Sequence, residues 1–192
     1  MANLCLTFYV IEGKKEEVKD LYQKLNSLLK MEKSLLDNGY GKNWLGNIVG
    51  LFGGDTEKNP CRGEYNNLEM DEEGTLIYLN TETAWNDMPE VFDLVISKYD
   101  TLSYYYRTEE GGVGYYATND VEGKHFPERY IVDTDLNGTM YFKETEDVFE
   151  HFEEITSVAV SCMEELEEKA HKYNNNGDGK FFNIYNIEIV GV

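Results

Sequence analysis

The segment "EYNNLEMDEEGTLIYLNTETAWNDMPEVFDLVISKY", residues 64–99, decides the fold because it predicts a β-hairpin that leads directly into a helix. Two extended stretches flank a turn at residues 72–74, a composition that is typical of a hairpin. Pro89 suits the first position of a helix, where its restricted φ is favourable, and it disfavours helical geometry at Met88. The apolar spacing predicts a helix over about 89–99 with a buried stripe of Val91, Phe92, Val95, Ile96 and Tyr99.

The neighbouring segments complete a βαββαβ order. Residues 4–12 alternate apolar side chains with smaller or more polar ones, which predicts a strand with one buried face. Residues 14–36 carry apolar side chains at helical spacing, and residues 101–120 predict a second hairpin that turns at paired glycines. This order is that of a ferredoxin-like antiparallel sheet with its helices on one face, so we expect an α+β fold.

The remaining chain predicts an elaboration of this core. Residues 121–192 contain a hairpin at Asn137-Gly138, a long helix, and an alternating final strand, "KFFNIYNIEIV". Between helix and strand, Gly177 or Gly179 is expected to adopt left-handed geometry. We expect this part to pack on the core of residues 1–120 as one compact unit. The predicted buried stripe of the long helix comprises Val148, Phe149, Phe152, Ile155, Ala159, Cys162, Met163, Leu166 and Ala170.

Composition restricts the partners. The 192 residues include 37 Asp and Glu but only 17 Lys and Arg, for a formal net charge of −20. A surface of this sign repels phosphate, which disfavours nucleic acid and anionic membranes. It suits basic proteins, cations or a partner without charge, and the ordinary interpretation is a soluble acidic protein with no charged partner. No run approaches the ~20 apolar residues of a membrane span, and the N-terminal residues do not follow a signal-peptide pattern. We therefore expect a cytoplasmic protein.

The sequence predicts neither a metal site nor a cofactor. Cys5, Cys61 and Cys162 share no close spacing, which favours buried thiols over disulfides or a zinc knuckle. The three histidines are far apart, and nothing marks one pair of carboxylates as catalytic. The stretch "NNNGDGKFFNIY" from Asn174 places oxygen side chains at early calcium-loop positions, but Tyr185 stands where a bidentate Glu is required.

The long connection over residues 37–62 is the best sequence candidate for part of a binding site. It holds six of the 17 glycines and a short apolar insert that begins at Trp44. Loops of this length are uncommon unless they pack or bind something. A pocket between this loop, Trp85 and the turn at Glu109 and Glu110 would combine aromatic rings with carboxylates, which suits a cationic ligand.

Trp85 has two interpretations. It is either the floor of such a binding surface or an anchor that wedges the sheet against the helix of residues 89–99. We expect the packing role, because aromatic side chains are usually buried. Replacement by alanine would then cost roughly 3–5 kcal/mol of stability.

The helix near the C-terminus is strongly acidic. Residues 144–168 hold ten carboxylates and no Lys or Arg. The ordinary interpretation is a helix that docks on the core and keeps a solvated acidic face. The sharper one is that its exposed face imitates the phosphates of DNA and occupies a DNA-binding protein. The residues of this candidate face are Glu164, Glu165, Glu167 and Glu168.

Four stretches together resemble one known family, the YubB-type ferredoxin-like domain proteins of plasmids, phages and other mobile elements. They are "MANLCLTFYVIEG" at the N-terminus, "NGYGKNW" at 38–44, "TAWNDMPEVFDLV" at 83–95 and "YYYRTEEGGVGYY" at 104–116. The similarity covers about residues 1–118 and departs from the family pattern at Leu4, where Trp is usual, and at Met88, where Pro is usual. It implies a ferredoxin-like fold and a bacterial mobile-element origin, but no established activity. It implies no iron–sulfur cluster, for which three scattered cysteines are too few.

These observations favour a non-enzymatic accessory protein of a mobile element that binds a protein partner, through an acidic surface. Two alternatives stay open. One is an acidic DNA mimic that inhibits a DNA-binding protein. The other is a small-molecule enzyme that uses the pocket between residues 37–62, Trp85 and the Glu109-Glu110 turn. The oligomeric state is also open.

Overall fold

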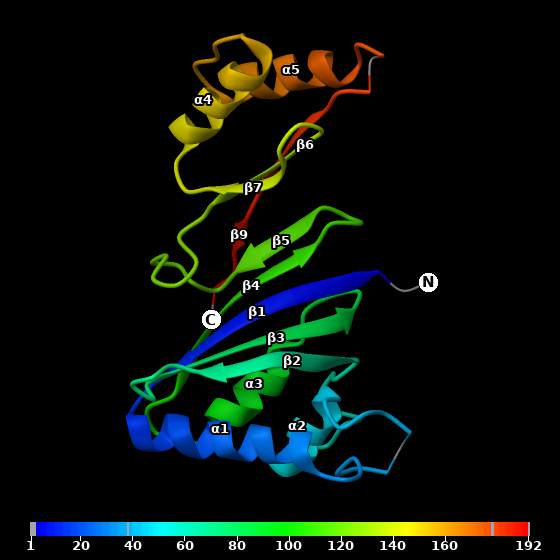
Figure 1. Ribbon diagram of the computed structural model, residues 1–192, viewed down its shortest axis with the longest axis vertical. Coiled ribbons are helices and arrows are strands. Elements are labelled where there is room, and N and C mark those ends of the chain that lie inside the picture. The colour runs from blue at the N-terminus through cyan, green and yellow to red at the C-terminus, as the bar shows by residue number, and fades with distance from the viewer. Residues whose placement is uncertain (1–2, 38, 178, 192) are drawn as a thin grey trace. The chain divides into compact units, whose positions relative to one another are not determined.

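The computed structural model in Figure 1 describes residues 3–37, 39–177 and 179–191, and it shows an α+β protein. The chain divides into two compact units, residues 1–115 and 116–192. Each unit contains both strands and helices. Across the described residues, no helix combines the length and apolarity that crossing a bilayer requires.

The first unit contains a sheet of four strands, β1 (Leu4–Glu12), β2 (Gly63–Met70), β3 (Leu76–Ala84) and β4 (Ser103–Glu110). Their order is β2-β3-β1-β4, and every neighbouring pair is antiparallel. The hairpin predicted from residues 64–85 is confirmed as β2 and β3. Its turn is closed by Asp71, whose carboxylate accepts the N–H groups of Thr75 and Leu76 at 2.7 and 2.9 Å.

Three helices lie on one side of this sheet: α1 (Lys15–Lys30), α2 (Leu45–Leu51) and α3 (Pro89–Ile96) (Figure 1). Pro89 opens α3, as its position in the sequence predicts. The predicted helix over residues 14–36 is too long, because α1 ends at Lys30. Ser34 and the backbone N–H of Leu36 instead bond the side chain of Asn47, and these contacts replace helical ones.

The side chains between sheet and helices form the core of this unit. Tyr9 contacts Phe92 of α3, with ring centroids 4.1 Å apart. Toward one end of β1 the layer becomes polar: the Cys5 thiol lies 3.0 Å from the Thr108 hydroxyl, which lies 2.8 Å from that of Thr7. The fully buried apolar residues of α1 and α3 are Val18, Leu21, Leu25, Val91 and Phe92.

The second unit begins within β5 (Tyr115–Thr118) and contains a three-stranded antiparallel sheet in the order β7-β6-β8. These strands are β6 (Tyr130–Thr134), β7 (Gly138–Phe142) and β8 (Phe182–Asn186), and β5 pairs in parallel with the short β9 (Glu188–Ile189). The helices α4 (Thr145–Thr156) and α5 (Met163–Asn174) pack on the sheet through a core of Val132, Val148, Phe152, Leu166, Ala170 and Phe182.

The prediction of one long C-terminal helix is wrong, because the chain breaks between α4 and α5. Ser157 has a left-handed φ of 59°, and the Thr156 hydroxyl bonds back to the carbonyl of Phe152. The connecting residues include Val and Ser, which are poor helix formers. Ala159 and Cys162, expected in the buried stripe, are exposed in this connection.

The end of α5 follows the prediction. Gly177 and Gly179 both have positive φ, 77° and 80°. That conformation is open to glycine at little cost, so it turns the chain toward β8. Asp178, the one charged early position of the calcium-like stretch, lies outside the described residues.

Candidate functional site

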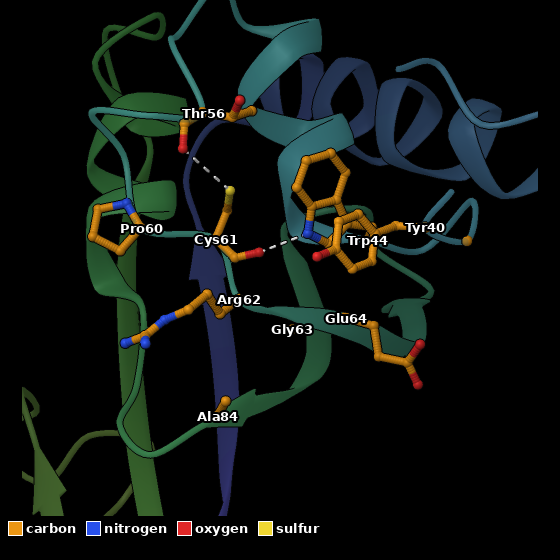
Figure 2. A pocket seen from close by; sticks show the side chains of 10 residues that line it. Tyr40, Trp44, Thr56, Pro60, Cys61, Arg62, Gly63, Glu64 and Ala84 are labelled. Carbon is orange, nitrogen blue, oxygen red and sulfur yellow. Dashed lines mark hydrogen bonds between the residues drawn. The ribbon is translucent and has the colours of Figure 1, made fainter. Parts of the chain in front are cut away.

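A cavity of the first unit lies beside Trp44, at the end of the sheet where β2 begins and β3 ends (Figure 2). Its volume is about 650 Å³, a size typical of ligand pockets. We call it the Trp44 pocket. Its lining residues are Tyr40, Gly41, Trp44, Thr56, Pro60, Cys61, Arg62, Gly63, Glu64 and Ala84.

Trp44 forms one wall of the pocket and is held by three contacts. Its indole N–H donates to the carbonyl of Cys61 at 2.8 Å, as Figure 2 shows. The ring of Tyr40 stacks on it, with centroids 4.8 Å apart and planes inclined by 24°. The third contact is Gly46, where an added Cβ would lie only 2.2 Å from the indole. The ring can fold back onto its own helix because residue 46 is glycine.

Asn47 holds in place the segment of the pocket wall around Gly41. This fully buried residue of α2 donates from its amide nitrogen to the carbonyls of Gly41 and Lys42, at 3.0 and 3.1 Å. Its amide oxygen accepts from Ser34 and Leu36. Asn47 was not predicted from the sequence, although one polar residue inside the apolar helix "LGNIVGL" is a usable signal.

The pocket has an apolar floor and a charged rim. Arg62 and Glu64 are exposed neighbours of the opening and point in different directions in Figure 2. Within the described part of the chain, the Arg62 guanidinium has no ion-pair or hydrogen-bond partner. Burial raises the pKa of the Cys61 thiol, whose nearest polar partner is the Thr56 carbonyl at 3.8 Å. A thiol in this state is a packing group and a weak nucleophile.

Trp85 does not have the packing role that we expected. Its side chain is 54% exposed, so it cannot wedge the sheet against α3. Its φ of 79° is in the left-handed region, which is strained for an aromatic residue. The backbone N–H of Trp85 bonds the Asn3 carbonyl at 3.0 Å, and this contact holds the chain while the ring faces solvent. Ala84, not Trp85, lines the Trp44 pocket.

Glu109 and Glu110 do not converge on one ligand. They are consecutive residues of β4, so their side chains point to opposite faces of the sheet. Glu110 is 2% exposed and accepts the N–H groups of Gly112 and Val113, which closes the following turn. Glu109 forms an ion pair with Arg107 at 3.0 Å. Neither carboxylate lines the Trp44 pocket.

The acidic face of α5 is partly neutralised. Glu165 pairs with Lys169, and Glu168 pairs with Lys172, each one helical turn along. The Lys169 bond, together with the Ser161 N–H and hydroxyl, lowers the pKa of Glu165 to about 2. Glu164 and Glu167 remain as exposed carboxylates, so the face carries fewer uncompensated charges than a phosphate array would need.

The three cysteines differ in burial. Cys5 and Cys61 are buried, as expected, but Cys162 is exposed. Among the residues that the structure describes, no cluster of three or more His, Cys, Asp or Glu side chains could hold a metal ion.

No family model, no curated protein and no solved structure matches the chain.

Proposed function

We propose that this chain is a non-enzymatic binding protein that holds an apolar or aromatic side chain of a protein partner in the Trp44 pocket. The observation that carries the proposal is the prearranged aromatic wall. Trp44 is fixed by a hydrogen bond, a stacked ring and a glycine contact before any ligand arrives. A preformed pocket loses little entropy when it binds, which makes a small apolar site effective.

The chemistry of the lining supports binding over catalysis. The pocket offers one guanidinium and one carboxylate at its rim, and these groups point apart. Catalysis by acid, base or nucleophile needs groups within hydrogen-bond reach of one reacting atom. The raised pKa of Cys61 also disfavours the thiolate that nucleophilic chemistry requires.

We further propose that the first unit is ferredoxin-like and that the chain is an accessory protein of a bacterial mobile element, acting in the cytoplasm. The strand order β2-β3-β1-β4 with antiparallel neighbours supports the fold. The mobile-element origin and the basic character of the partner rest on the resemblance and on the net charge of −20.

The pocket is tested by NMR on the indole N–H of Trp44, assigned in a Trp85→Phe background. The probes are the N-acetyl amides of phenylalanine, leucine, lysine and glutamate. We expect the two apolar probes to shift the Trp44 resonance saturably, with a Kd on the order of 1 mM, the usual range for so small a ligand. The two charged probes should leave it unchanged.

Two variants make the test specific. Ala84→Leu should fill the pocket and remove the response to the apolar probes. Thr139→Leu adds the same side chain at an exposed strand position of the second unit and should leave the response intact. A response that survives Ala84→Leu, or none in the parent, would refute the pocket proposal. Turnover of a small molecule that is lost on Cys61→Ser would refute the non-enzymatic part.

A further inference from the structure

The sheet of the first unit has a second face, opposite its three helices. Along β1, Cys5, Thr7 and Tyr9 are buried under the helices. Because side chains alternate along a strand, their neighbours point to the other side. We call that side the outer face. Its residues are Leu4, Leu6, Phe8, Val10 and Glu12 of β1, Glu64, Asn66 and Glu69 of β2, Leu76, Tyr78, Asn80, Glu82 and Ala84 of β3, and Ser103, Tyr105, Arg107 and Glu109 of β4.

An apolar stripe runs along the middle of the outer face. It consists of the alternate residues of β1 from Leu4 to Val10, with Tyr78 and Tyr105 in register on either side of Val10. Leu4 is 66% exposed and Tyr78 is 40% exposed, Leu6 and Phe8 are half-buried, and Val10 is buried, so the stripe is open at Leu4 and at Tyr78. Exposed large apolar side chains grouped on one face are typical of a surface that binds a partner.

Carboxylates flank this stripe. Leu6 lies between Glu82 on β3 and Glu109 on β4. Glu82 also stands directly opposite Glu64 on β2. Like charges in directly opposed positions of two strands destabilise a sheet, so this pair opposes folding. A positively charged partner would offset that repulsion by attracting both carboxylates.

The charge balance of the outer face determines the sign of the charge that a complementary partner carries. It carries five glutamates against one arginine, Arg107, which is already paired with Glu109. Aromatic rings on an open sheet also suit the stacking of RNA bases, but phosphates would be repelled by this excess of carboxylates. The complementary partner is therefore a cation that also presents apolar surface.

The dimensions of the outer face select one helix as the occupant. Six residue steps from Leu4 to Val10 span roughly 20 Å, and four strands span roughly 19 Å. The resulting area of about 400 Å² is half of what one partner buries in a standard protein–protein interface. Its roughly 20 Å length matches an α-helix of about 13 residues, which is 10–12 Å wide with its side chains and so covers β1 and leaves the flanking strands along its two sides.

From this match we infer that the outer face binds an amphipathic helix of the protein partner, with its apolar stripe along β1 and its Lys or Arg side chains against the flanking glutamates. The inference rests on the proposed function because it takes the partner to be a protein. It adds a second contact surface and the chemistry of the segment that docks there.

The probe is a 15-residue peptide with leucine at i, i+3, i+4 and i+7 spacing and lysine elsewhere. Its controls are a scrambled peptide of the same composition and a peptide with glutamate in place of lysine. Binding is measured by calorimetry at low salt and mapped by NMR. We expect shifts centred on β1 and β3, at least tenfold weaker binding of the scrambled peptide, and no binding of the glutamate peptide.

The variants separate this face from general attraction to an acidic protein. Glu69→Lys with Glu82→Lys should weaken binding at least tenfold. Glu164→Lys with Glu167→Lys changes the net charge equally, on α5, and should weaken it less than threefold. Tyr78→Ala, at an exposed ring, should weaken it at least threefold. Circular dichroism spectra that match the parent's would show that these variants are folded.

Three outcomes would overturn the inference: equal losses in the two charge-reversal variants, equal binding of the scrambled peptide, or preferential binding of a 12-nucleotide RNA at the same face. Failure here is distinguishable from failure of the pocket. Gly46→Ala should abolish the Trp44 response to apolar amides while peptide binding stays unchanged, because residue 46 lies in α2, on the opposite side of the sheet.

Discussion

The position of Trp44 depends on a missing side chain, which makes Gly46→Ala the most informative single change. An added Cβ would lie 2.2, 2.3 and 2.4 Å from three carbon atoms of the indole ring. Ordinary contact begins near 3.4 Å, so the ring must retreat by about 1 Å. That movement would break the bond of the indole N–H to the Cys61 carbonyl, now 2.8 Å long, and separate the ring from Tyr40.

The expected change in stability follows from three contributions. Losing the hydrogen bond costs about 1 kcal/mol. Losing the ring stack costs about 0.5–1.5 kcal/mol. Alanine in place of glycine within a helix returns about 1 kcal/mol. The net result is a destabilisation of about 1 kcal/mol, with the sign set by the Trp44 contacts.

Gly50→Ala is the matched control, because it makes the same substitution in the same helix. The nearest atom to its new Cβ is a methyl carbon of Leu36 at 3.1 Å, on a flexible side chain that can yield. This variant should be neutral or up to about 1 kcal/mol more stable. The two variants should therefore differ by about 2 kcal/mol, taking the contributions above together.

Urea unfolding followed by circular dichroism measures this difference, and the emission of Trp44 in a Trp85→Phe background reports the ring directly. We expect Gly46→Ala to shift the Trp44 emission to longer wavelength and to abolish the response of the pocket to apolar amides. If Gly46→Ala is as stable as Gly50→Ala and its emission is unchanged, the account of how the pocket is built is wrong.

Three further predictions concern the same unit. Trp85→Ala should change the free energy of unfolding by less than about 1 kcal/mol, because the ring is exposed. Trp85→Gly should be more stable than Trp85→Ala, because glycine relieves the strain of the left-handed φ. Urea unfolding measures both variants, and a loss of 3 kcal/mol or more in Trp85→Ala would show that the ring has the packing role after all. Glu82→Gln should stabilise the protein by roughly a few tenths of a kcal/mol, because it removes the repulsion with Glu64. This gain in stability should disappear in 1 M NaCl, which screens the repulsion, and a gain that persists there has another cause. Asp71 accepts backbone N–H groups of the β2–β3 turn, and these bonds, that of Leu76 first, lower its pKa. Because the folded pKa lies below the unfolded one, this contribution to stability is present above pH ~4 and is lost as the pH falls through the folded pKa. In acid titrations, Asp71→Asn should be less stable than the parent at pH 7 and should converge with it at pH 2. A difference in stability that stays constant with pH would contradict this role of Asp71.

Local patterns predicted the hairpin and helix of residues 64–99 well. Strand alternation and the restricted φ of Pro89 act over a few residues, so the sequence contains nearly all that decides them. Apolar periodicity predicted helices that were too long over residues 14–36 and near the C-terminus. At residues 34–36, hydrogen bonds from the distant Asn47 compete with helix continuation, and periodicity does not register them.

The candidate site shows the same division. Alternation along β4 already implies that Glu109 and Glu110 point apart, so that signal was present in the sequence. The different roles of the two tryptophans could not be predicted from the sequence. Both stand near glycine-rich or turn-forming segments, but only Trp44 finds a carbonyl, a stacked ring and a glycine around it.

By itself, the sequence determined the net charge of −20, most of the strands and helices, and the excess of carboxylates on which the proposal of a cationic partner rests. These properties are additive over residues or arise within a few positions of one another. Only the tertiary structure decided that Cys61 and Ala84 join Trp44 around one pocket, and that Glu64, Glu82 and Glu109 share a row beside Leu6. Those groupings depend on strand register and on contacts between residues far apart in the chain, which no local periodicity encodes.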